Sequence, residues 1–360
     1  MRGLYVHVPF CRLKCPYCGF YSETNFDKDI VTKYFKACLE TVDAAKNNQF
    51  DTIYYGGGTP SSVTGGILED FTDKLLSRIN FSGLEFTVEA NPESVSKDFT
   101  DFVKNFPISR VSLGVQSLND DTLKKLGRIH NSKQALQACD KILDCNVSLN
   151  TDIIFDIPET DQKAVFETLK VLTSFGHDHI SAYSYSSDDR GYMAGFDSDF
   201  TQYDHVENYL EERYFKKYEI SNFAKEGKES KHNIIYWTGD EYLGVGASAH
   251  SMIYSDSGLK QRYSFPENIH QYIANPQTYS FFEELNEETA FKETLIFGLR
   301  MKKGIDVGNI EKRFGKMPLN LLNNIEKYID LGMLQWNGEH LQTTKRGALI
   351  LDSLSCCLWD

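Results

Sequence analysis

Apolar and polar residues alternate along the first half of the chain in a pattern that predicts strands separated by helices. Short apolar runs typical of strands recur six times, and segments with apolar residues at helical spacing lie between them. The predicted strands span residues 4–8, 52–55, 84–88, 110–113, 148–154 and 179–183. The predicted helices span about 28–46, 66–79, 97–104, 120–126, 133–143 and 162–175. Such repeats of strand then helix imply an α/β fold with a parallel sheet covered by helices, either doubly wound or a partial barrel.

Unusual polar groups gather at or near the carboxyl ends of these predicted strands. A cysteine loop follows the first strand, and Gly56-Gly-Gly-Thr-Pro60 follows the second. Glu89, Gln116 and Asp152 stand at or near the ends of the third, fourth and fifth strands. Ligands of α/β barrels and open sheets bind at this face, so the pattern predicts one shared site.

The rest of the chain divides into two further predicted sections after a core at residues 1–186. The second section, 187–282, opens with a Gly/Asp-rich connection at 188–195 and is predicted to extend the core. The third, 283–360, is helix-rich and closes with two short strands around Asn337-Gly338, a typical hairpin turn. Helices followed by such a hairpin indicate a winged-helix-like module within an α+β C-terminal extension.

Composition and charge narrow the class of protein. The 360 residues carry a net charge of −13, which argues against a broad nucleic-acid-binding surface. The predicted helix at 318–330 has one lysine against two acids, so we expect no nucleic acid on the C-terminal module. We find no transmembrane segment and no secretory signal pattern, and the eight scattered cysteines do not form a disulfide framework. A reducing, cytoplasmic location is therefore expected.

The cysteine loop is the most informative motif. Cys11, Cys15 and Cys18 follow a C-x3-C-x2-C spacing, and three thiolates can hold three corners of a [4Fe–4S] cube while one iron stays open. The alternative is a Cys3His zinc site completed by His7. Zinc sites more often pair C-x2-C units from two segments, and no second C-x2-C or H-x3-H occurs in the chain. The spacing therefore favours a cluster over zinc.

Other polar residues on the predicted ligand face suit an organic ligand. The triple glycine turn is a weak signal alone, but it lets a ligand approach bare backbone beside the cysteine loop. Glu89, Gln116, Arg128 and Asp152 are each ordinary when taken singly. As a set, they could hold a ribose, an ammonium and a carboxylate.

Two histidines are candidate haem ligands. His232, with Tyr236 and Trp237 nearby at helical spacing, would by default be part of a capped, partly buried helical turn. His250 lies in a Gly/Ala/Ser turn whose small residues leave room for a large flat ligand. Since neutral imidazole is a good axial ligand for haem iron, His232 and His250 are both kept as candidates, with Tyr236 and Trp237 beside them.

With these residues in view, the sequence resembles the radical S-adenosylmethionine (SAM) superfamily over nearly all of its length. More narrowly, it is similar to the group of oxygen-independent coproporphyrinogen III dehydrogenase and the HemW-type haem chaperones. The specific segments are 5–11 leading into 15–18, then 56–60, 89–92, 114–117 and 232–237. The resemblance implies a radical SAM partial (β/α)6 barrel and a [4Fe–4S] cluster on Cys11, Cys15 and Cys18. It also implies SAM contacts from Tyr5, Tyr17, Gly57, Gly58, Thr59, Glu89, Gln116, Arg128 and Asp152.

Three features separate the subgroups. The dehydrogenase pattern has a fourth cysteine where this chain has Phe20, and an N-terminal extension before the cluster strand. The H-N-x-x-Y-W run at 232–237 is typical of the chaperones. Gly19, where an acidic residue is usual, and the short connection after Tyr183, which lacks the usual Pro/Gly-rich segment, depart from the chaperone pattern.

The leading hypothesis is a haem chaperone that binds the cluster, SAM and haem and passes haem to an unidentified acceptor protein. The alternative is an enzyme, a dehydrogenase that oxidatively decarboxylates porphyrinogen propionates through SAM cleavage. A zinc-stabilised DNA-binding regulator is a third, remote interpretation. Whether the protein is an enzyme stays open at this stage, as do the acceptor, the haem stoichiometry and the oligomeric state.

Overall fold

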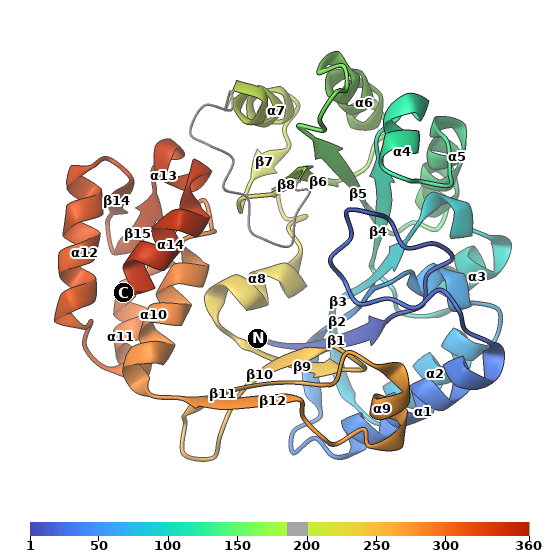
Figure 1. Ribbon diagram of the computed structural model, residues 1–360, viewed down its shortest axis with the longest axis horizontal. Helices are drawn as coiled ribbons and strands as arrows, with labels where there is room; N and C mark the ends of the chain where they lie inside the picture. The colour runs from blue at the N-terminus through green and yellow to red at the C-terminus, as the bar shows by residue number, and fades with distance from the viewer. Residues whose placement is uncertain (186–200, 360) are drawn as a thin grey trace.

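Six parallel strands form the centre of the molecule in the computed structural model, which describes residues 1–185 and 201–359 (Figure 1). They are β1 (Arg2–Val8), β2 (Gln49–Gly57), β3 (Asn80–Ala90), β4 (Arg110–Gln116), β5 (Ser148–Phe155) and β6 (His179–Ser184). They lie side by side in chain order, and each neighbouring pair is parallel. Because the strand order never reverses, the sheet is a partial barrel and not a doubly wound sheet. The predicted α/β fold is confirmed.

The connecting helices lie on the outer side of these strands (Figure 1). They are α1 (Lys28–Asp43), α2 (Ile67–Leu76), α3 (Lys97–Asn105), α4 (Asp120–Lys125), α5 (Ser132–Leu143) and α6 (Lys163–Ser174). Short 3-10 helices at Pro60–Val63 and Pro92–Ser94 follow β2 and β3. Several helices begin at a capping side chain, as when Asp27 accepts from the Ile30 amide at 2.9 Å. Each predicted helix and strand of this half is present.

The sheet continues beyond both edges of the six strands. Its further strands are β9 (Glu241–Val245), β10 (His250–Tyr254), β11 (Lys260–Ser264) and β12 (Phe281–Leu285) beside β1, and β8 (Asn222–Ala224) and β7 (Lys216–Lys217) beside β6. Of these, β9 is parallel to β1, and the others pair antiparallel. Helices α7 (Thr201–Glu211) and α9 (Ile269–Ala274) accompany them. One hydrophobic core runs from Leu4 to Tyr272, through both predicted sections. The predicted connection at 188–195, the short connection noted after Tyr183 and the boundary at 186/187 fall outside the described residues, and the domain limits stay predictions.

Helix α8 (Lys231–Thr238) carries the H-N-x-x-Y-W run and lies on the inner side of the sheet, against β1, β2 and β3 (Figure 1). Gly3 of β1 makes room for it, since a Cβ there would stand 2.9 Å from the His232 ring. The run is therefore part of the barrel interior.

The C-terminal module has a hydrophobic core of its own, from Leu285 to Leu358. Its helices are α10 (Glu287–Gly298), α11 (Val307–Phe314), α12 (Leu319–Asp330), α13 (Lys345–Leu349) and α14 (Leu351–Trp359). Its small sheet contains β13 (Ile305–Asp306), β14 (Leu334–Asn337) and β15 (His340–Thr343). The predicted hairpin at Asn337-Gly338 is confirmed, with Gly338 at φ 62°. Within the part of the chain that the structure describes, no helix has the length and apolar character needed to cross a membrane.

Candidate cofactor-binding site

A cavity of about 530 Å³ opens among the carboxyl ends of the parallel strands and extends into the barrel. Its lining includes all three cysteines of the loop and eight of the nine residues expected to contact SAM: Tyr17, Gly57, Gly58, Thr59, Glu89, Gln116, Arg128 and Asp152. The ninth, Tyr5, does not line the cavity and packs against Tyr54, which does. The ends of β1 to β5, together with the α4–α5 connection that carries Arg128, thus bring together residues from six separate chain segments.

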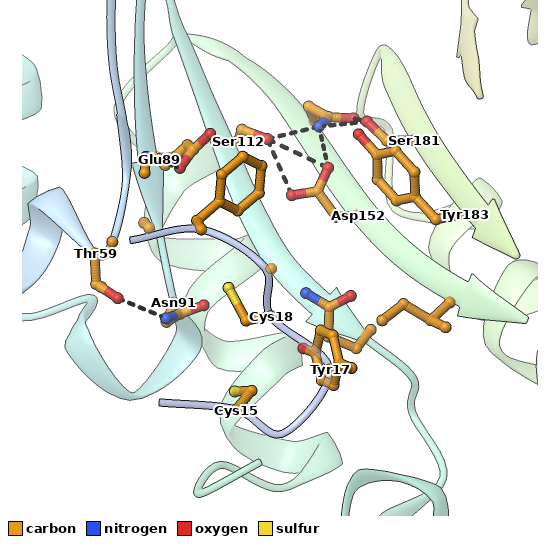
Figure 2. A pocket seen from close by; sticks show the side chains of 18 of the residues that line it. Cys15, Tyr17, Cys18, Thr59, Glu89, Asn91, Ser112, Asp152, Ser181 and Tyr183 are labelled. Carbon is orange, nitrogen blue, oxygen red and sulfur yellow. Dashed lines mark hydrogen bonds between the residues drawn. The ribbon is translucent and has the colours of Figure 1, made fainter. Parts of the chain in front are cut away.

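The cysteine loop is closed at its base and open toward the cavity. Pro9 and Cys11 exchange backbone hydrogen bonds with Glu23, at 2.6 and 3.0 Å, so the loop leaves and returns at one point. Inside it, the Cys18 amide donates to the Cys15 carbonyl at 3.1 Å. All three thiols are free and half-exposed, and burial raises the pKa of the Cys11 and Cys18 thiols. Figure 2 shows Cys15 and Cys18 on this loop, at the side of the cavity where Thr59 and Asn91 lie.

The donor set fits a four-iron cluster. Among the described residues, no three His, Cys, Asp or Glu side chains lie close enough together to hold one metal ion. In a [4Fe–4S] cube each thiolate binds a different iron, so the three sulfurs stand farther apart than around a single ion. Three free thiols on one loop, all lining one cavity, are the donor set that such a cluster uses.

His7 is not placed as a zinc ligand. Its Nε2 donates to the Tyr21 carbonyl at 2.9 Å, and its Nδ1 accepts from the Tyr5 hydroxyl at 2.9 Å. The ring is only 3% exposed, and burial lowers its pKa to about 4, so it is neutral with both nitrogens engaged. His7 is therefore not available as the fourth ligand of a Cys3His zinc site. Its hydrogen bonds give it a structural role beneath the cysteine loop.

The glycine turn is shaped by close contacts. Gly57 has φ 101°, and a Cβ there would stand 2.2 Å from the His7 ring, while one on Gly58 would stand 2.6 Å from the Val8 carbonyl oxygen. The Gly57 amide donates to Glu89 at 3.0 Å, and the Gly58 amide donates to Val8. Both N–H groups are therefore already hydrogen-bonded within the protein. The turn gives a ligand space beside a backbone without side chains, but these two amides are not free to donate to it.

Burial and hydrogen bonding act in opposite directions on the pKa of the Glu89 carboxyl group. Besides the Gly57 amide, the Tyr54 hydroxyl donates to it at 2.7 Å. Burial raises the pKa of Glu89 to about 7, although these hydrogen bonds favour the charged form. A cation placed in the cavity beside Glu89 would therefore favour its ionised state.

Arg128 ties the cysteine loop to the strand ends. Its Nη1 lies 3.5 Å from both the Cys15 sulfur and the Tyr17 hydroxyl, and its Nη2 donates to Asn91 at 2.6 Å and to the Gly114 carbonyl at 2.9 Å. Asn91 in turn donates to Thr59, whose hydroxyl lies 3.4 Å from the Cys11 sulfur. Arg128 and Asn91 thus link the cysteine loop to the ends of β3 and β4.

Gln116 reaches the cavity through an irregular backbone. It has φ 64°, an uncommon value for a residue other than glycine, and the pairing of β4 with β5 shifts register between Gly114 and Gln116. Such irregularities at strand ends re-aim side chains.

Asp152 belongs to a buried polar network that the strand-end pattern alone did not identify. Asn150 donates to Asp152 at 2.8 Å, and Ser112 lies 3.2 Å from the same carboxylate (Figure 2). Burial raises the pKa of Asp152, while these hydrogen bonds oppose the shift. The other cavity residues not foreseen include Tyr54, Asn91, Arg110, His179, Ser181, Tyr183, Asn222, Ser230 and Asn233. Many of them repeat every second residue along a strand, as at 110, 112, 114 and 116 in β4, and that period of two is the signal that could have found them.

The four candidate haem residues lie away from the cavity lining, whereas their neighbour Asn233 is part of it. His232 is fully buried, with Nδ1 2.7 Å from the Thr52 hydroxyl and Nε2 2.8 Å from the Tyr236 hydroxyl. Neither nitrogen is free for iron in this arrangement. Trp237 stacks against the Arg300 guanidinium at 4.5 Å. His250 is exposed at the start of β10, and no hydrogen bond joins its ring to another described residue.

Known proteins have a similar architecture and related sequences. Residues 5–171 match the family model of the radical SAM superfamily, and residues 285–350 match that of the HemN C-terminal domain. A solved structure described as coproporphyrinogen III oxidase (HemN) from Escherichia coli, a radical SAM enzyme, superposes with TM-score 0.82 at 17% identity. That match covers 99% of this chain and 89% of the other, and it shows the fold.

Two curated relatives match over almost their whole length. Both are named heme chaperone HemW. The protein from Buchnera aphidicola (subsp. Schizaphis graminum) is 30% identical over 98% of this chain and 96% of its own. That from Bacillus subtilis is 29% identical over 97% of each chain. The chain therefore belongs to the heme chaperone HemW family of the radical SAM superfamily.

Proposed function

We propose that this protein binds a [4Fe–4S] cluster, SAM and haem, and transfers haem to an acceptor protein. The observation that carries the proposal is the convergence of Cys11, Cys15 and Cys18 with Glu89, Gln116, Arg128 and Asp152 around one cavity. The curated relatives named as haem chaperones, and Phe20 in place of a fourth cysteine, favour haem delivery over porphyrinogen oxidation.

In this proposal the three cysteines hold the cluster, which supplies one iron with an open coordination position for the amino and carboxylate groups of SAM. Arg128 stands beside Cys15, with its Nη1 3.5 Å from the Cys15 sulfur, and places a positive charge next to the cluster site. Asp152 and Glu89 would offer carboxylate oxygens to the ribose hydroxyls and to the N–H groups of the amino group. Gly57, Gly58 and Thr59 leave room for the ligand beside the backbone.

For haem, the geometry favours His250 over His232 as the axial ligand. Both nitrogens of His232 are engaged, and burial lowers its pKa to about 3. The ring of His250 is exposed, with no hydrogen bond to another described residue. Tyr236 and Trp237 then act with His232 in seating helix α8, which faces the cavity through Asn233.

Cluster binding is tested by anaerobic purification of the wild type and of single Cys→Ser variants at the three loop positions. We expect iron and sulfide near four each per chain and absorbance near 400 nm, lost in every loop variant. Cys139→Ser is the matched control, because Cys139 is fully buried in the core. Zinc in place of iron would contradict the proposal.

Haem binding is tested by titrating the intact protein with haemin. We expect a saturable Soret change that His250→Ala shifts, while His232→Gln leaves the axial-ligand spectrum unchanged. A parallel incubation with coproporphyrinogen III, SAM and a reductant separates the two candidate activities, because a vinyl-bearing product would establish the dehydrogenase. Haem transfer to an acceptor and a cytoplasmic location stay predictions from the sequence.

A further inference from the structure

A continuous series of hydrogen bonds joins Asp152, at the strand-end side of the cavity, to the start of helix α8. Its links are Ser230 N to the Tyr218 hydroxyl at 3.3 Å, Tyr218 to His179 Nε2 at 2.9 Å, His179 Nδ1 to Asn150 at 2.7 Å, and Asn150 to Asp152 at 2.8 Å. His179 and Asn150 are 1% and 5% exposed. Both residues, and Ser230 as well, line the cavity, so the hydrogen bonds run along its wall.

Each link in this chain has one possible direction. The Asn150 amide oxygen can only accept, so the proton of the neutral His179 ring is on Nδ1. The lone pair on Nε2 must then accept from the Tyr218 hydroxyl, whose oxygen accepts from the Ser230 amide. Every donor thus points toward the Asp152 carboxylate. Hydrogen bonds aligned in this way polarise and strengthen one another.

The far end of the chain is the N-terminus of α8. Ser230 is its capping residue, and its hydroxyl accepts from the Asn233 amide at 3.3 Å. Glu85 accepts from the amides of Lys231 and His232 at 2.9 and 3.1 Å. The Ser230 amide is therefore the point where the chain from Asp152 meets the helix.

We propose that Tyr218, His179 and Asn150 are positioning residues that couple occupancy of the cavity at Asp152 to the seating of helix α8. The inference rests on the proposed function for the identity of the cavity ligand, SAM. Asn150 donates to Oδ1 of Asp152 at 2.8 Å, and the Ser112 hydroxyl lies 3.2 Å from Oδ2, so a ligand donor can approach Oδ2 without displacing Asn150. A bound ligand also excludes water from the network and strengthens its links, which holds the helix more firmly.

Hydrogen–deuterium exchange of the cluster-loaded protein tests the coupling. SAM is expected to slow exchange of the amides at 231–238 by about fivefold or more, the lower end of typical coupling between sites. In Tyr218→Phe, which keeps the ring and loses the hydroxyl, we expect SAM to slow the same amides by less than about twofold.

The matched control is Tyr203→Phe, because the Tyr203 hydroxyl donates to the Ile220 carbonyl and takes no part in the hydrogen bonds between Asp152 and Ser230. It is expected to keep the wild-type response to SAM. A merely structural role for Tyr218 predicts faster exchange with and without SAM and an unchanged ratio, which would overturn the proposal. The ratio of exchange rates without and with SAM would also stay at its wild-type value in Tyr218→Phe if the coupling passed through Tyr54, which joins Glu89 to the His232 ring. That result overturns the role proposed for Tyr218.

Calorimetric measurement of SAM binding to the wild type distinguishes failure of the proposed coupling from failure of the proposed function. Absence of SAM binding to the wild type contradicts both. Binding without slower exchange in α8 of the wild type overturns the coupling alone, and this readout needs no variant. If Tyr218→Phe does not fold, His179→Ala is used instead, because it interrupts the same series of hydrogen bonds. A wild-type ratio of exchange rates without and with SAM in His179→Ala also overturns the proposed coupling.

Discussion

At the scale of single residues, the site depends on side chains and glycines that pack behind it. His7, Tyr5 and Tyr54 lie under the glycine turn and the cysteine loop and hold both through hydrogen bonds or ring contacts. Gly57 admits the His7 ring at a distance that no side chain allows. The position of the cavity lining thus depends on Tyr5 and His7, which are not part of the lining themselves.

Gly57→Ala is expected to destabilise the protein by about 2–4 kcal/mol, because the new methyl group clashes with His7 and the residue keeps φ 101°. Gly83→Ala is the control, since Gly83 also has positive φ but no atom within 4 Å of its Cβ position. It is expected to cost about 1 kcal/mol. Urea unfolding measures both, and equal losses would contradict the role assigned to His7.

Buried neutral histidine makes stability depend on pH. His232 has a folded pKa of about 3, below its ordinary value of 6.5, so the unfolded chain binds its proton first as pH falls. Stability is then lost below pH 6.5, by about 2 kcal/mol from this residue at pH 5. His232→Gln should remove that share of the pH dependence, although it lowers stability at pH 7. Denaturant unfolding from pH 7 to 5 checks the slope, with His270→Gln, an exposed position, expected to leave it unchanged.

Residue patterns predicted the strand-end groups but not the network behind them. Glu89, Gln116 and Asp152 stand out because each follows an apolar run. Asn150 and His179 lie inside strands, and nothing local shows that they face a cavity instead of a neighbouring helix. His232 was foreseen as a candidate ligand, yet its engaged nitrogens depend on Thr52, 180 residues earlier in the chain.

At the scale of secondary structure elements, helix α8 connects the barrel interior to the C-terminal module. It packs on β1, β2 and β3, and Trp237 contacts Arg300, which follows α10. Its N-terminus is held by Glu85, a fully paired buried carboxylate, with the Arg110 guanidinium 3.4 Å away. The helix is short, so these contacts and not its intrinsic propensity keep it in place.

Glu85→Gln is expected to cost about 3–5 kcal/mol, because it leaves the buried Arg110 without its counter-charge. Glu85→Gln with Arg110→Gln should lose less than the sum of the two single variants. A double-mutant cycle by urea unfolding measures the difference. Additive losses would show that the pair does not interact.

The elements of the first half were predictable because helical and strand periods alternate without interruption there. Pairings between distant elements were not. β9 lies beside β1 although about 240 residues separate them, and no local pattern marks that partnership. Likewise the pattern of α8 is that of a capped, partly buried helical turn, and only the tertiary fold places it on the inner side of the sheet.

At the scale of the whole molecule, two hydrophobic cores meet where β11 of the sheet faces α10 of the C-terminal module. One carboxylate, Glu293 of α10, pairs there with two cations of β11: Lys260 at 2.7 Å and Arg262. Lys260 and Glu293 are 1% and 3% exposed. The junction is therefore a charge cluster in which Glu293 faces the buried Lys260 and the partly exposed Arg262, while Arg262 also pairs with Glu283 of β12.

This arrangement predicts unequal effects from removing each partner of the buried pair. Glu293→Gln leaves the buried Lys260 ammonium without its counter-charge, at a cost of about 3–5 kcal/mol. Lys260→Met keeps the volume and leaves Glu293 paired with Arg262, so we expect a loss of about 1 kcal/mol or less. The double variant should recover much of the loss caused by Glu293→Gln, because no unpaired ammonium remains. Urea unfolding at pH 7 ranks the three variants, and a larger loss from Lys260→Met would refute this view of the junction.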